Sequence, residues 1–536
     1  MRERNELVLA DLIAARAERT PDFDVVTFDG DGVRPHEVRT YADLWTNGQR
    51  IAAALLARGM AKGDRFALMM RNHPEFVETM VAASVAGCVF VPIDPRTRGE
   101  KLAYALRDSG CRGVVCADYA LVELIAVRDR LPALEWLLVL ESREEPGSPG
   151  AADVPGAEAM AGVLDAPVRA LDVRVDLPAD PLEIIYTSGT TGDPKGVVCS
   201  NGKYVAASLI GHLVGFEPSD RPYNGLSLTH GNAQLITLAP SLAMGLRCVF
   251  SRRFTKSRIW DVTRRHGCTH FNLLGGMATA IYSEPPRPDD ADNPVRMVIS
   301  AGMPAALWEA FERRFDVRVL ECYGAVEGGL AIKPVGVGPV GSFGKPPPNL
   351  EMRVVDEHGV ECPPGVVGEL ISRPATGEDA EVEYFKNPEA SRAKVRGGWL
   401  RSGDMCHRDA DGWYFFDYRK GGGIRHNGDF VNPGFVEKVI AEHPAVDDVF
   451  VYGVPAASGA PGEKDVVAAV VPADADRFDA AGVFAACRKG LEPNFVPSYL
   501  QVVDEIPKTA SEKPQERFLL DLFATRPERV LTEQRG

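Results

Sequence analysis

The chain begins with an alternation of amphipathic and strongly apolar segments. Apolar positions recur at helical spacing from Leu7 to Arg19 and from Tyr41 to Arg58, whereas residues 65–70 and 88–92 are short apolar runs. Helical spacing predicts a helix with one buried face, and short apolar runs bounded by turn residues predict buried strands. This alternation predicts an α/β fold in which helices cover a mostly parallel sheet.

The longest apolar stretch runs from Thr79 to Ile93 and is interrupted by Ser84, Gly87 and Pro92. A membrane-spanning helix needs about 20 consecutive apolar residues, so this stretch is too short to cross a bilayer. We interpret it as a helix followed by a buried strand.

The pattern changes twice toward the C-terminus. From residue 343 to residue 416, short strand-like segments alternate with turn signals, which predicts a small β-rich module. Three consecutive glycines at 421–423 then precede a final stretch with both helix-like and strand-like segments. We therefore predict a large N-terminal α/β domain over residues 1–419, which includes the β-rich module at about 343–419, and a small α+β domain over residues 420–536.

The composition restricts the classes of partner. The 536 residues include 60 Lys+Arg and 75 Asp+Glu, which gives a net charge of −15. This balance argues against nucleic-acid binding and against docking on an anionic membrane, because both need a surplus of cations. The ten cysteines are scattered without zinc-type spacing, so we expect reduced, mostly buried thiols in a cytoplasmic protein.

The segment from Tyr186 to Gly196 carries the strongest chemical signal. It has the sequence Tyr-Thr-Ser-Gly-Thr-Thr-Gly-Asp-Pro-Lys-Gly and follows an apolar run at residues 182–185 that predicts a buried strand. Such a loop suits a polyphosphate, because glycines let backbone N–H groups turn toward the anion while hydroxyls and the lysine contact its oxygens. The lysine is followed by glycine, so this is not a Walker A loop. A hydroxyl-rich turn without function is the alternative interpretation.

Four further segments extend this signal into a pattern that resembles the adenylate-forming superfamily of acyl-CoA synthetases, adenylation domains and firefly-type luciferases. They are similar to the family's second signature, ribose motif, hinge and C-terminal lysine motif, in the family's order: Tyr323–Glu327, Trp399–Asp404, Arg419–Glu437 and Pro507–Lys513. Within the superfamily, the segment from Leu226 to Glu284 looks most like crotonobetaine/carnitine-type acyl-CoA ligases.

The chain departs from the family pattern at three positions. Val326 stands where threonine is usual, Glu512 where glycine is usual, and Gly421 where the hinge commonly has Asp or Lys. Glycine lowers the torsional restriction on a hinge but supplies no charge that favours one orientation. These departures leave open whether both half-reactions of the family are performed.

The resemblance implies an acyl-CoA ligase that works in two steps. A carboxylate attacks the α-phosphate of Mg-ATP and expels pyrophosphate, and the thiol of CoA then displaces AMP from the acyl-adenylate. The implied cofactors are ATP/AMP, Mg²⁺ and coenzyme A. The resemblance also implies a mobile C-terminal domain that rotates between the two steps.

Binding roles follow by position from the same resemblance. The nucleotide-binding set combines the phosphate loop with the surroundings of adenine and ribose: Thr187, Ser188, Gly189, Thr190, Thr191, Lys195, Gly302, Met303, Pro304, Cys322, Tyr323, Gly324, Asp404 and Arg419. Tyr323 is expected to stack on adenine, and Asp404 to accept from the ribose hydroxyls with Arg419 donating nearby. Ordinary turn chemistry is the alternative for Asp404.

The implied catalytic set consists of Lys513, Glu327, His230 and Thr187. Lys513 offsets the charge that builds up as the carboxylate meets the α-phosphate. Glu327 binds Mg²⁺ through a hard oxygen ligand. The alternatives are a solvated lysine, a solvated glutamate and a structural histidine.

The acyl pocket and the CoA channel are implied in the same way. The acyl-pocket set is His230, Asn232, Gln234, Gly275, Gly276, Met277 and Gly302, and Arg425 and Gly428 face the CoA channel. Glycines leave room for a bulky acyl group, and methionine adapts to an irregular apolar shape. We expect an apolar carboxylic acid as substrate, with cyclic acids included.

Other functions stay open beside the complete ligase. The enzyme could thioesterify an acyl-adenylate supplied by a partner enzyme, or it could load a carrier protein instead of CoA. A nucleotide-binding protein without catalysis is disfavoured by the joint presence of Lys195, Glu327, Asp404, Arg419 and Lys513. An amino-acid substrate is disfavoured because no aspartate occurs around Thr229. Dimers are common in the resembled family, so a homodimer is also open.

Overall fold

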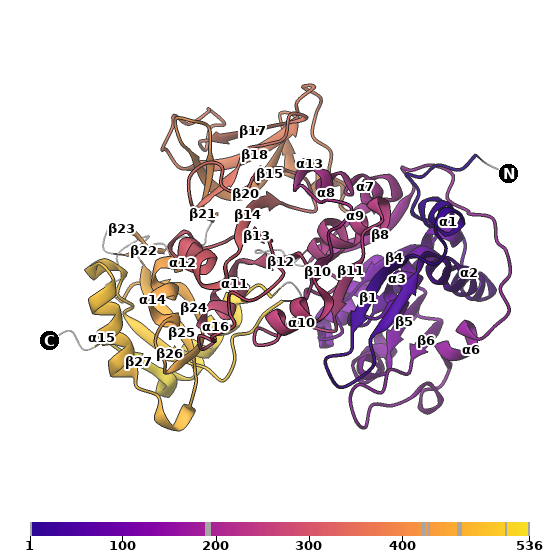
Figure 1. Cartoon of the computed structure of the whole chain (residues 1–536), viewed down its shortest axis with the longest axis horizontal. Helices are drawn as coiled ribbons and strands as arrows, with labels where there is room; N and C mark the ends of the chain where they lie inside the picture. Colours follow the sequence, from indigo (N-terminus) through magenta and orange to yellow (C-terminus); the bar gives the residue numbers. More distant parts are fainter. Residues whose placement is uncertain are drawn as a thin grey trace. The chain divides into compact units, whose positions relative to one another are not determined.

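The computed structural model describes residues 3–187, 194–420, 424–426, 429–431, 433–457, 464–509 and 512–533. The chain divides into two compact units (Figure 1). The first unit consists of Met1–Phe254 and Val382–Ala393, and the second of Thr255–Glu381 and Lys394–Gly536. The domain boundary that the sequence places near residue 420 is not one of these division points, and it stays a prediction.

The first unit contains a seven-stranded sheet whose neighbours are all parallel except the last pair. Its strands, in spatial order, are β7 (Ala157–Ala159), β6 (Trp136–Leu140), β5 (Gly113–Ala117), β3 (Arg65–Met69), β4 (Val89–Pro92), β8 (Pro181–Thr187) and β9 (Lys195–Ser200). The predicted strands at 65–70, 88–92 and 182–185 are therefore confirmed.

Three helices of this unit pack on one another, and the third also packs on β4 (Figure 1). They are α1 (Leu9–Arg19), α2 (Tyr41–Ala57) and α3 (Pro74–Ala86). A capping box starts α2, because the Thr40 side chain accepts from the Asp43 N–H and the Asp43 side chain accepts from the Thr40 N–H. The helix α3 is buried all round, begins at a proline and ends at Gly87, whose φ of 68° suits glycine. The interpretation of residues 79–93 as a helix followed by a strand is thus confirmed.

A second group of strands in the first unit is ordered β10 (Pro222–Asn224), β11 (Cys248–Ser251), β1 (Asp24–Asp29) and β2 (Glu37–Thr40). The segment between β10 and β11 includes a π-helix, η4 (Asn232–Leu238), followed by α9 (Ala239–Met244). π-Helical turns are uncommon and are frequent at functional sites.

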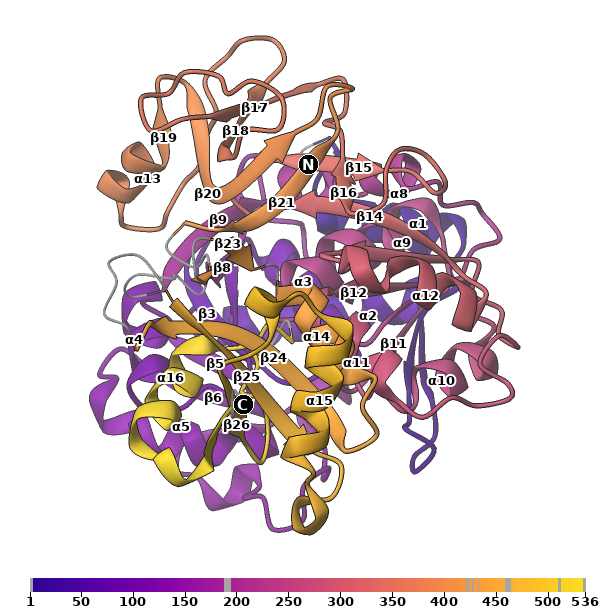
Figure 2. The same cartoon turned by 90° about the vertical axis from the view of Figure 1, so that its left-hand side faces the viewer.

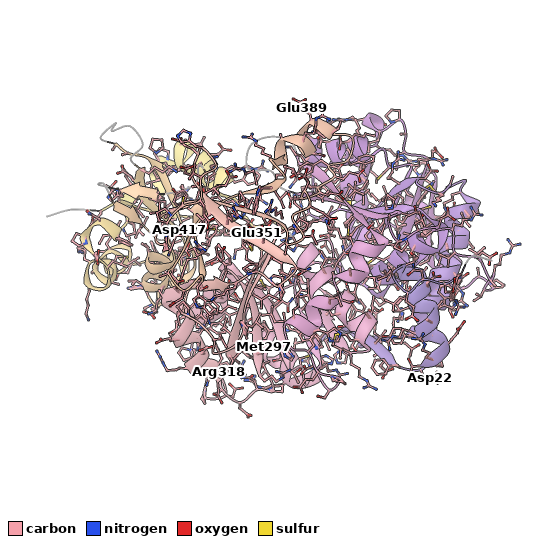
Figure 3. The ribbon with its side chains drawn as sticks, turned by 90° about the horizontal axis from the view of Figure 1, so that it is seen from above. Asp22, Met297, Arg318, Glu351, Glu389 and Asp417 are labelled. Carbon is pink, nitrogen blue, oxygen red and sulfur yellow. The ribbon has the colours of Figure 1, made fainter. Side chains whose placement is uncertain are left out.

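The second unit begins with three parallel strands and an antiparallel fourth: β12 (His270–Leu274), β13 (Met297–Ala301), β14 (Arg318–Gly324) and β15 (Leu330–Lys333). Met297 and Arg318 are register partners at the start of β13 and β14 (Figure 3). The helix α10 (Ile259–His266) precedes β12, α11 (Gly275–Ser283) connects β12 to β13, and α12 (Ala305–Phe315) connects β13 to β14. Trp260 stacks on Phe315 with ring centroids 4.5 Å apart, which joins α10 to α12.

The predicted β-rich module is confirmed as an antiparallel sheet. Its strands, in spatial order, are β16 (Ser342–Gly344), β21 (Tyr414–Arg419), β20 (Trp399–Arg408), β18 (Gly368–Pro374) and β17 (Leu350–Val355), and β19 (Val395–Arg396) pairs with β20. Glu351 on β17 and Asp417 on β21 are labelled in Figure 3.

The C-terminal residues form a four-stranded sheet with helices on both faces. The strands are β24 (Val446–Pro455), β25 (Lys464–Pro472), β26 (Tyr499–Val502) and β27 (Val530–Thr532). Along β25, Val466, Ala468 and Val470 face one core cluster, while Val467 and Ala469 face another, as the two-residue period of a strand requires. Figure 2 shows this sheet between α16 (Glu516–Thr525) and the pair α14 (Pro433–Ala441) and α15 (Ala480–Gly490).

Two further observations bear on the sequence predictions. Nine of the ten cysteine side chains are buried, Cys322 is half-buried and all ten are free thiols. Among the described residues, no helix combines the length and the apolar character that crossing a membrane requires.

One polar contact fixes the start of β24 within the second unit. The Lys256 ammonium donates to the Asp447 carboxylate at 2.7 Å and to the Asp447 carbonyl oxygen at 2.9 Å. The Ser283 hydroxyl donates to the same carbonyl oxygen at 3.1 Å. Asp447 therefore connects the C-terminal sheet to Ser283 at the end of α11 and to Lys256, three residues ahead of Ile259.

Candidate active site

The predicted phosphate loop is bracketed by a β-hairpin. Thr187 at the end of β8 is the register partner of Lys195 at the start of β9. Gly196 fits this hairpin because a Cβ at this position would lie only 2.5 Å from a methyl carbon of Ile184. The Lys195 ammonium lies 5.5 Å from the centroid of the Tyr384 ring. Ser188, Gly189, Thr190 and Thr191 lie outside the described residues.

The turn that carries His230 is well ordered by hydrogen bonds. The His230 N–H donates to the Ser227 carbonyl oxygen at 3.0 Å, and the Asn232 N–H donates to His230 Nδ1 at 3.2 Å. A backbone N–H can only donate, so the proton of a neutral His230 ring is on Nε2. Asn232 Oδ1 accepts from the Asn224 amide at 3.3 Å, and Gln234 is fully buried. His230 and Asn232 are only half-buried, so they retain contact with solvent.

Asp404 sits at the centre of a polar cluster in the second unit. Its carboxylate accepts from the Tyr323 hydroxyl at 2.7 Å and from Arg419 Nε at 2.8 Å. Asp404 on β20 and Arg419 on β21 are register partners, so the sheet places the two groups face to face. The Tyr323 ring lies 4.9 Å from that of Phe343, and burial raises the pKa of Tyr323 well above its usual value. A carboxylate offers about four acceptor positions, so Asp404 has capacity for further donors.

Lys513 belongs to the same cluster. Partial desolvation and the nearby Arg419 guanidinium lower the pKa of Lys513, while the Asp404 carboxylate raises it. The loop that carries Lys513 is closed by a bridge between Lys508 and Pro514, and the Thr509 N–H donates to the Lys513 carbonyl oxygen at 2.8 Å. The structure thus brings Lys513, which the resemblance places in the catalytic set, together with Arg419, Asp404 and Tyr323 of the nucleotide-binding set.

Glu512, which stands where the resembled family has glycine, adopts a left-handed backbone with a φ of 56°. This conformation costs an L-residue about 1–2 kcal/mol and is free for glycine. The departure from the family pattern therefore falls at a position whose backbone favours glycine.

Gly276 faces the lysine loop. A Cβ built on Gly276 would lie 3.8 Å from the Pro514 ring and 3.9 Å from the Glu512 carbonyl oxygen, which are ordinary contact distances. Met277 is buried at 1% exposure and its sulfur lies 3.4 Å from the Leu274 N–H. A larger side chain at Gly276 would therefore displace the loop that carries Lys513.

Glu321 is a buried residue of this region to which none of the sequence motifs points. Its carboxylate accepts from the Gly302 N–H and from the Met303 N–H, the latter at 3.1 Å. Burial raises the pKa of Glu321 to about 7, and the two backbone donors lower it. Its register partner on β15 is Lys333. The signal in the sequence is a lone acid in the apolar run Val-Leu-Glu-Cys-Tyr, two residues ahead of Tyr323.

The other predicted residues are placed as follows. Glu327 is half-buried after the end of β14, and its carboxylate is a hard oxygen donor of the kind that Mg²⁺ binds. Pro304 and Cys322 are half-buried, and burial raises the pKa of the Cys322 thiol. Gly324 is exposed. Gly275 is the first residue of α11. Arg425 is paired with Phe430 in a short hairpin, and Gly428 lies outside the described residues.

A cavity of about 330 Å³ lies elsewhere, in the β-rich module, and Arg353, Trp399 and Arg401 are among its lining residues. None of the predicted site residues lines this cavity. Two of its arginines are paired with acids, Arg353 with Glu351 and Arg401 with Glu369, the latter pair at 3.3 Å. This cavity therefore does not mark the candidate site.

Comparisons with known proteins show the family to which this chain belongs. The profile of the AMP-binding enzyme family matches residues 13–376, and that of the AMP-binding enzyme C-terminal domain matches residues 436–513. The medium/long-chain-fatty-acid–CoA ligase FadD17 of Mycobacterium tuberculosis is 32% identical over 90% of this chain and 91% of its own length.

Two further comparisons bear on the resemblance and on the fold. The crotonobetaine/carnitine–CoA ligase of Salmonella choleraesuis is 26% identical over 88% of this chain and 91% of its own length. The crystal structure of the anthranilate CoA ligase AuaEII in complex with anthranoyl-AMP has a TM-score of 0.81 at 23% identity and covers 97% of each chain. The resemblance stated from the motifs and the α/β fold class are both confirmed.

Proposed function

We propose that this chain, which belongs to the AMP-binding enzyme family, is an acyl-CoA ligase of the AMP-forming type. It activates a carboxylic acid as an acyl-adenylate with Mg-ATP and then transfers the acyl group to the thiol of CoA. The observation that carries this proposal is the cluster in which Asp404 holds Tyr323 and Arg419 while Lys513 lies within electrostatic range of Asp404 and Arg419.

The cluster suits the first step because that step brings two anions together. A carboxylate approaching a phosphate is opposed by charge repulsion, and a fixed cation offsets it most strongly where water is partly excluded. Lys513 supplies this cation, and Arg419 is held in place by Asp404. The remaining lone pairs of Asp404 accept the ribose hydroxyls.

Further residues complete the nucleotide site in this proposal. Tyr323 and the backbone of Gly302 and Met303 enclose the adenine, and Glu321 holds that backbone through two N–H groups. The phosphate loop from Thr187 to Lys195 binds the phosphates. When bound, Mg²⁺ would be held by Glu327 and would neutralise phosphate charge.

The substrate that we propose is an apolar carboxylic acid. In this proposal, which follows the family resemblance, His230 and Asn232 of the first unit contact the acyl group, as do Gly275, Gly276 and Met277 at the start of α11 in the second unit. Gly276 leaves space up to the loop that carries Lys513, and the relative FadD17 is named for medium and long-chain fatty acids. Arg425 and Gly428 face the channel for CoA in this proposal, and we place the enzyme in the cytoplasm.

The test is a screen for pyrophosphate release with Mg-ATP over a panel of acids, namely octanoate, decanoate, benzoate, cyclohexanecarboxylate and sulfoacetate, run with and without CoA. We expect pyrophosphate with the apolar acids and acyl-CoA when CoA is added. Release of pyrophosphate with sulfoacetate, but with none of the four apolar acids, would contradict the apolar substrate class. No pyrophosphate with any acid would contradict the complete ligase.

The same screen separates the two alternative functions. The departures at Val326, Gly421 and Glu512 favour a test of the half-reactions one at a time. Thioester formation from supplied decanoyl-AMP and CoA, without pyrophosphate release from ATP, would assign the enzyme to the second half-reaction, with a partner enzyme as the source of adenylate. Transfer to a phosphopantetheinylated carrier protein but not to CoA would assign it to carrier loading. Sedimentation of the full chain decides whether it is a homodimer.

A further inference from the structure

A buried carboxylic acid lies in the strand that leads into the phosphate loop. Glu183 is 0% exposed on β8, in the otherwise apolar run from Leu182 to Ile185. The Gln234 amide donates to its Oε2 at 3.0 Å, and Gln234 is also 0% exposed. A polar pair of this kind is costly to bury unless its hydrogen bonds are made.

The same amide group of Gln234 reaches the turn that precedes it. Gln234 Nε2 also donates to the Leu228 carbonyl oxygen at 2.9 Å. Leu228 lies two residues ahead of His230, and its own N–H donates to Asn72 Oδ1 at 2.7 Å. Both backbone groups of Leu228 are therefore held by buried side chains.

Asn72 holds this turn from the other side. Its amide group donates to the carbonyl oxygens of Leu226 and Ser251, both at 2.8 Å, and the residue is 0% exposed. The turn from Leu226 to His230 is thus fixed by Asn72 on one side and by the Glu183–Gln234 pair on the other. Glu183 is the member of this arrangement that belongs to the strand ending at Thr187.

We propose that Glu183 is a positioning residue of the acyl pocket, which through Gln234 and Leu228 fixes the turn that presents His230 and joins this turn to the strand of the phosphate loop. This inference rests on the proposed function and adds to it a physical connection between the acid-binding segment and the ATP-binding segment. Gln234 acts in it from the protein interior, as the connecting group between Glu183 and Leu228.

The charge state of Glu183 supports this role. Burial raises the pKa of Glu183 to about 8, while Gln234 and the nearby Lys203 and Cys199 lower it. Tyr204, on the same short helix as Lys203, also faces Glu183. Glu183 is therefore mostly un-ionised at neutral pH, and a glutamine in its place keeps both the shape and an acceptor oxygen for Gln234.

The test compares three variants of the full chain, with decanoate as the probe acid. Glu183→Leu removes the acceptor, Glu183→Asp withdraws it by one methylene group, and Glu183→Gln keeps it. We expect the KM for decanoate to rise roughly tenfold in the Leu and Asp variants, which corresponds to one lost buried hydrogen bond, and to stay within about twofold in the Gln variant. The KM for ATP should change by less than about twofold in all three.

Amide hydrogen exchange without any substrate gives a second readout. Peptides that cover residues 226–234 should exchange faster in Glu183→Leu and Glu183→Asp than in the wild type and in Glu183→Gln. The control is Glu78→Leu in the same unit, because Glu78 is also 0% exposed and accepts from Arg39 at 2.6 Å. This control should leave the exchange of residues 226–234 unchanged.

Unchanged exchange at residues 226–234 in both the Leu and the Asp variant would overturn the inference, as would equal rises of the two KM values. If Glu183→Leu does not fold, Glu183→Asp with Glu183→Gln still decides the question. A wild type without activity on any acid of the panel would overturn the proposed function instead, and the exchange experiment would still decide whether Glu183 fixes the turn.

Discussion

Lys513 is held by a short loop whose geometry is set by backbone bonds on both sides of it. The bridge between Lys508 and Pro514 and the bonds between Thr509 and Lys513 fix the ends of the loop. Lys513 is an exposed residue, and partial desolvation together with the nearby Arg419 guanidinium lowers the pKa of its ammonium. A cation in this setting acts more strongly on an approaching anion than one in open water.

We expect Lys513→Ala to lower the rate of acyl-adenylate formation by roughly 100-fold or more, because it removes a cation positioned where charge develops. The measurement is pyrophosphate release with decanoate. Thioester formation from supplied decanoyl-AMP and CoA should remain within a few-fold of the wild type. Lys508→Ala is the matched control, because the Lys508 ammonium is bound to Asp448 at 2.6 Å and serves the structure. Equal rates of pyrophosphate release for Lys513→Ala and the wild type would contradict the role of Lys513 in acyl-adenylate formation.

Glu512, in the loop that carries Lys513, has a left-handed backbone conformation with a φ of 56°. Glu512→Gly removes the steric cost of about 1–2 kcal/mol but adds the entropy cost of glycine, so the free energy of unfolding should change by less than about 1 kcal/mol. Glu512→Val should lower it by about 1–2 kcal/mol, because a β-branched residue tolerates this region least. Urea unfolding measures the free energy of unfolding of both variants. A Glu512→Val variant as stable as Glu512→Gly would contradict the steric cost that we assign to this backbone conformation.

Among the elements, β14 and β15 carry an acid and a base that are register partners, Glu321 and Lys333. Glu321 holds the backbone of Gly302 and Met303, and Lys333 faces it from the neighbouring strand with its ammonium 4.7 Å from the centroid of the Trp308 ring. Burial lowers the pKa of Lys333, which Glu321 and Glu312 raise. A change in the charge of Glu321 therefore acts on the backbone of Gly302 and Met303, which encloses the adenine in the proposed function.

We expect the KM for ATP to fall roughly fivefold as the pH rises through 7, because Glu321, with a pKa of about 7, becomes a carboxylate that accepts the two N–H groups more strongly. In Glu321→Gln this dependence should disappear, since the amide does not titrate. Steady-state kinetics between pH 6 and 8 measure it. A wild type and a Gln variant with the same pH profile would exclude Glu321 as its source.

At the level of elements, the sequence predicts what depends on local pattern. The helix α3 and the strand β4 follow from an apolar stretch with Gly87 between them, and β8 follows from the apolar run ahead of the loop. The sequence does not predict that Glu183 meets Gln234 or that Glu321 meets Gly302. These pairs are 51 and 19 residues apart, and their contact depends on strand register and on the path of the turns.

On the scale of the whole molecule, several carboxylic acids are buried with raised pKa values. Burial raises the pKa of Glu75 and of Glu437 to about 7, as it does for Glu321, and that of Glu183 to about 8. In the unfolded chain such groups titrate near 4.5. The folded state keeps these protons to a higher pH than the unfolded state does.

The protonated carboxyl groups therefore make their full contribution to the free energy of unfolding below about pH 4.5. This contribution is lost as the pH rises through 7 to 8. The net charge of −15 acts in the same direction. Thermal unfolding should give a melting temperature several degrees higher at pH 5.5 than at pH 8.5. An equal or higher value at pH 8.5 would contradict the prediction.

The Asp447 contact has a consequence for the timing of the proposed reaction. Lys256 and Ser283 donate three hydrogen bonds to Asp447 at the start of β24. If the C-terminal residues change position between the two steps, as the resemblance to adenylate-forming enzymes implies, these bonds must break once in every catalytic cycle. The energy needed to break the bonds between Lys256 and Asp447 would then slow the domain movement that follows the first step. Lys256 would limit the turnover rate in this way without contacting the reacting atoms.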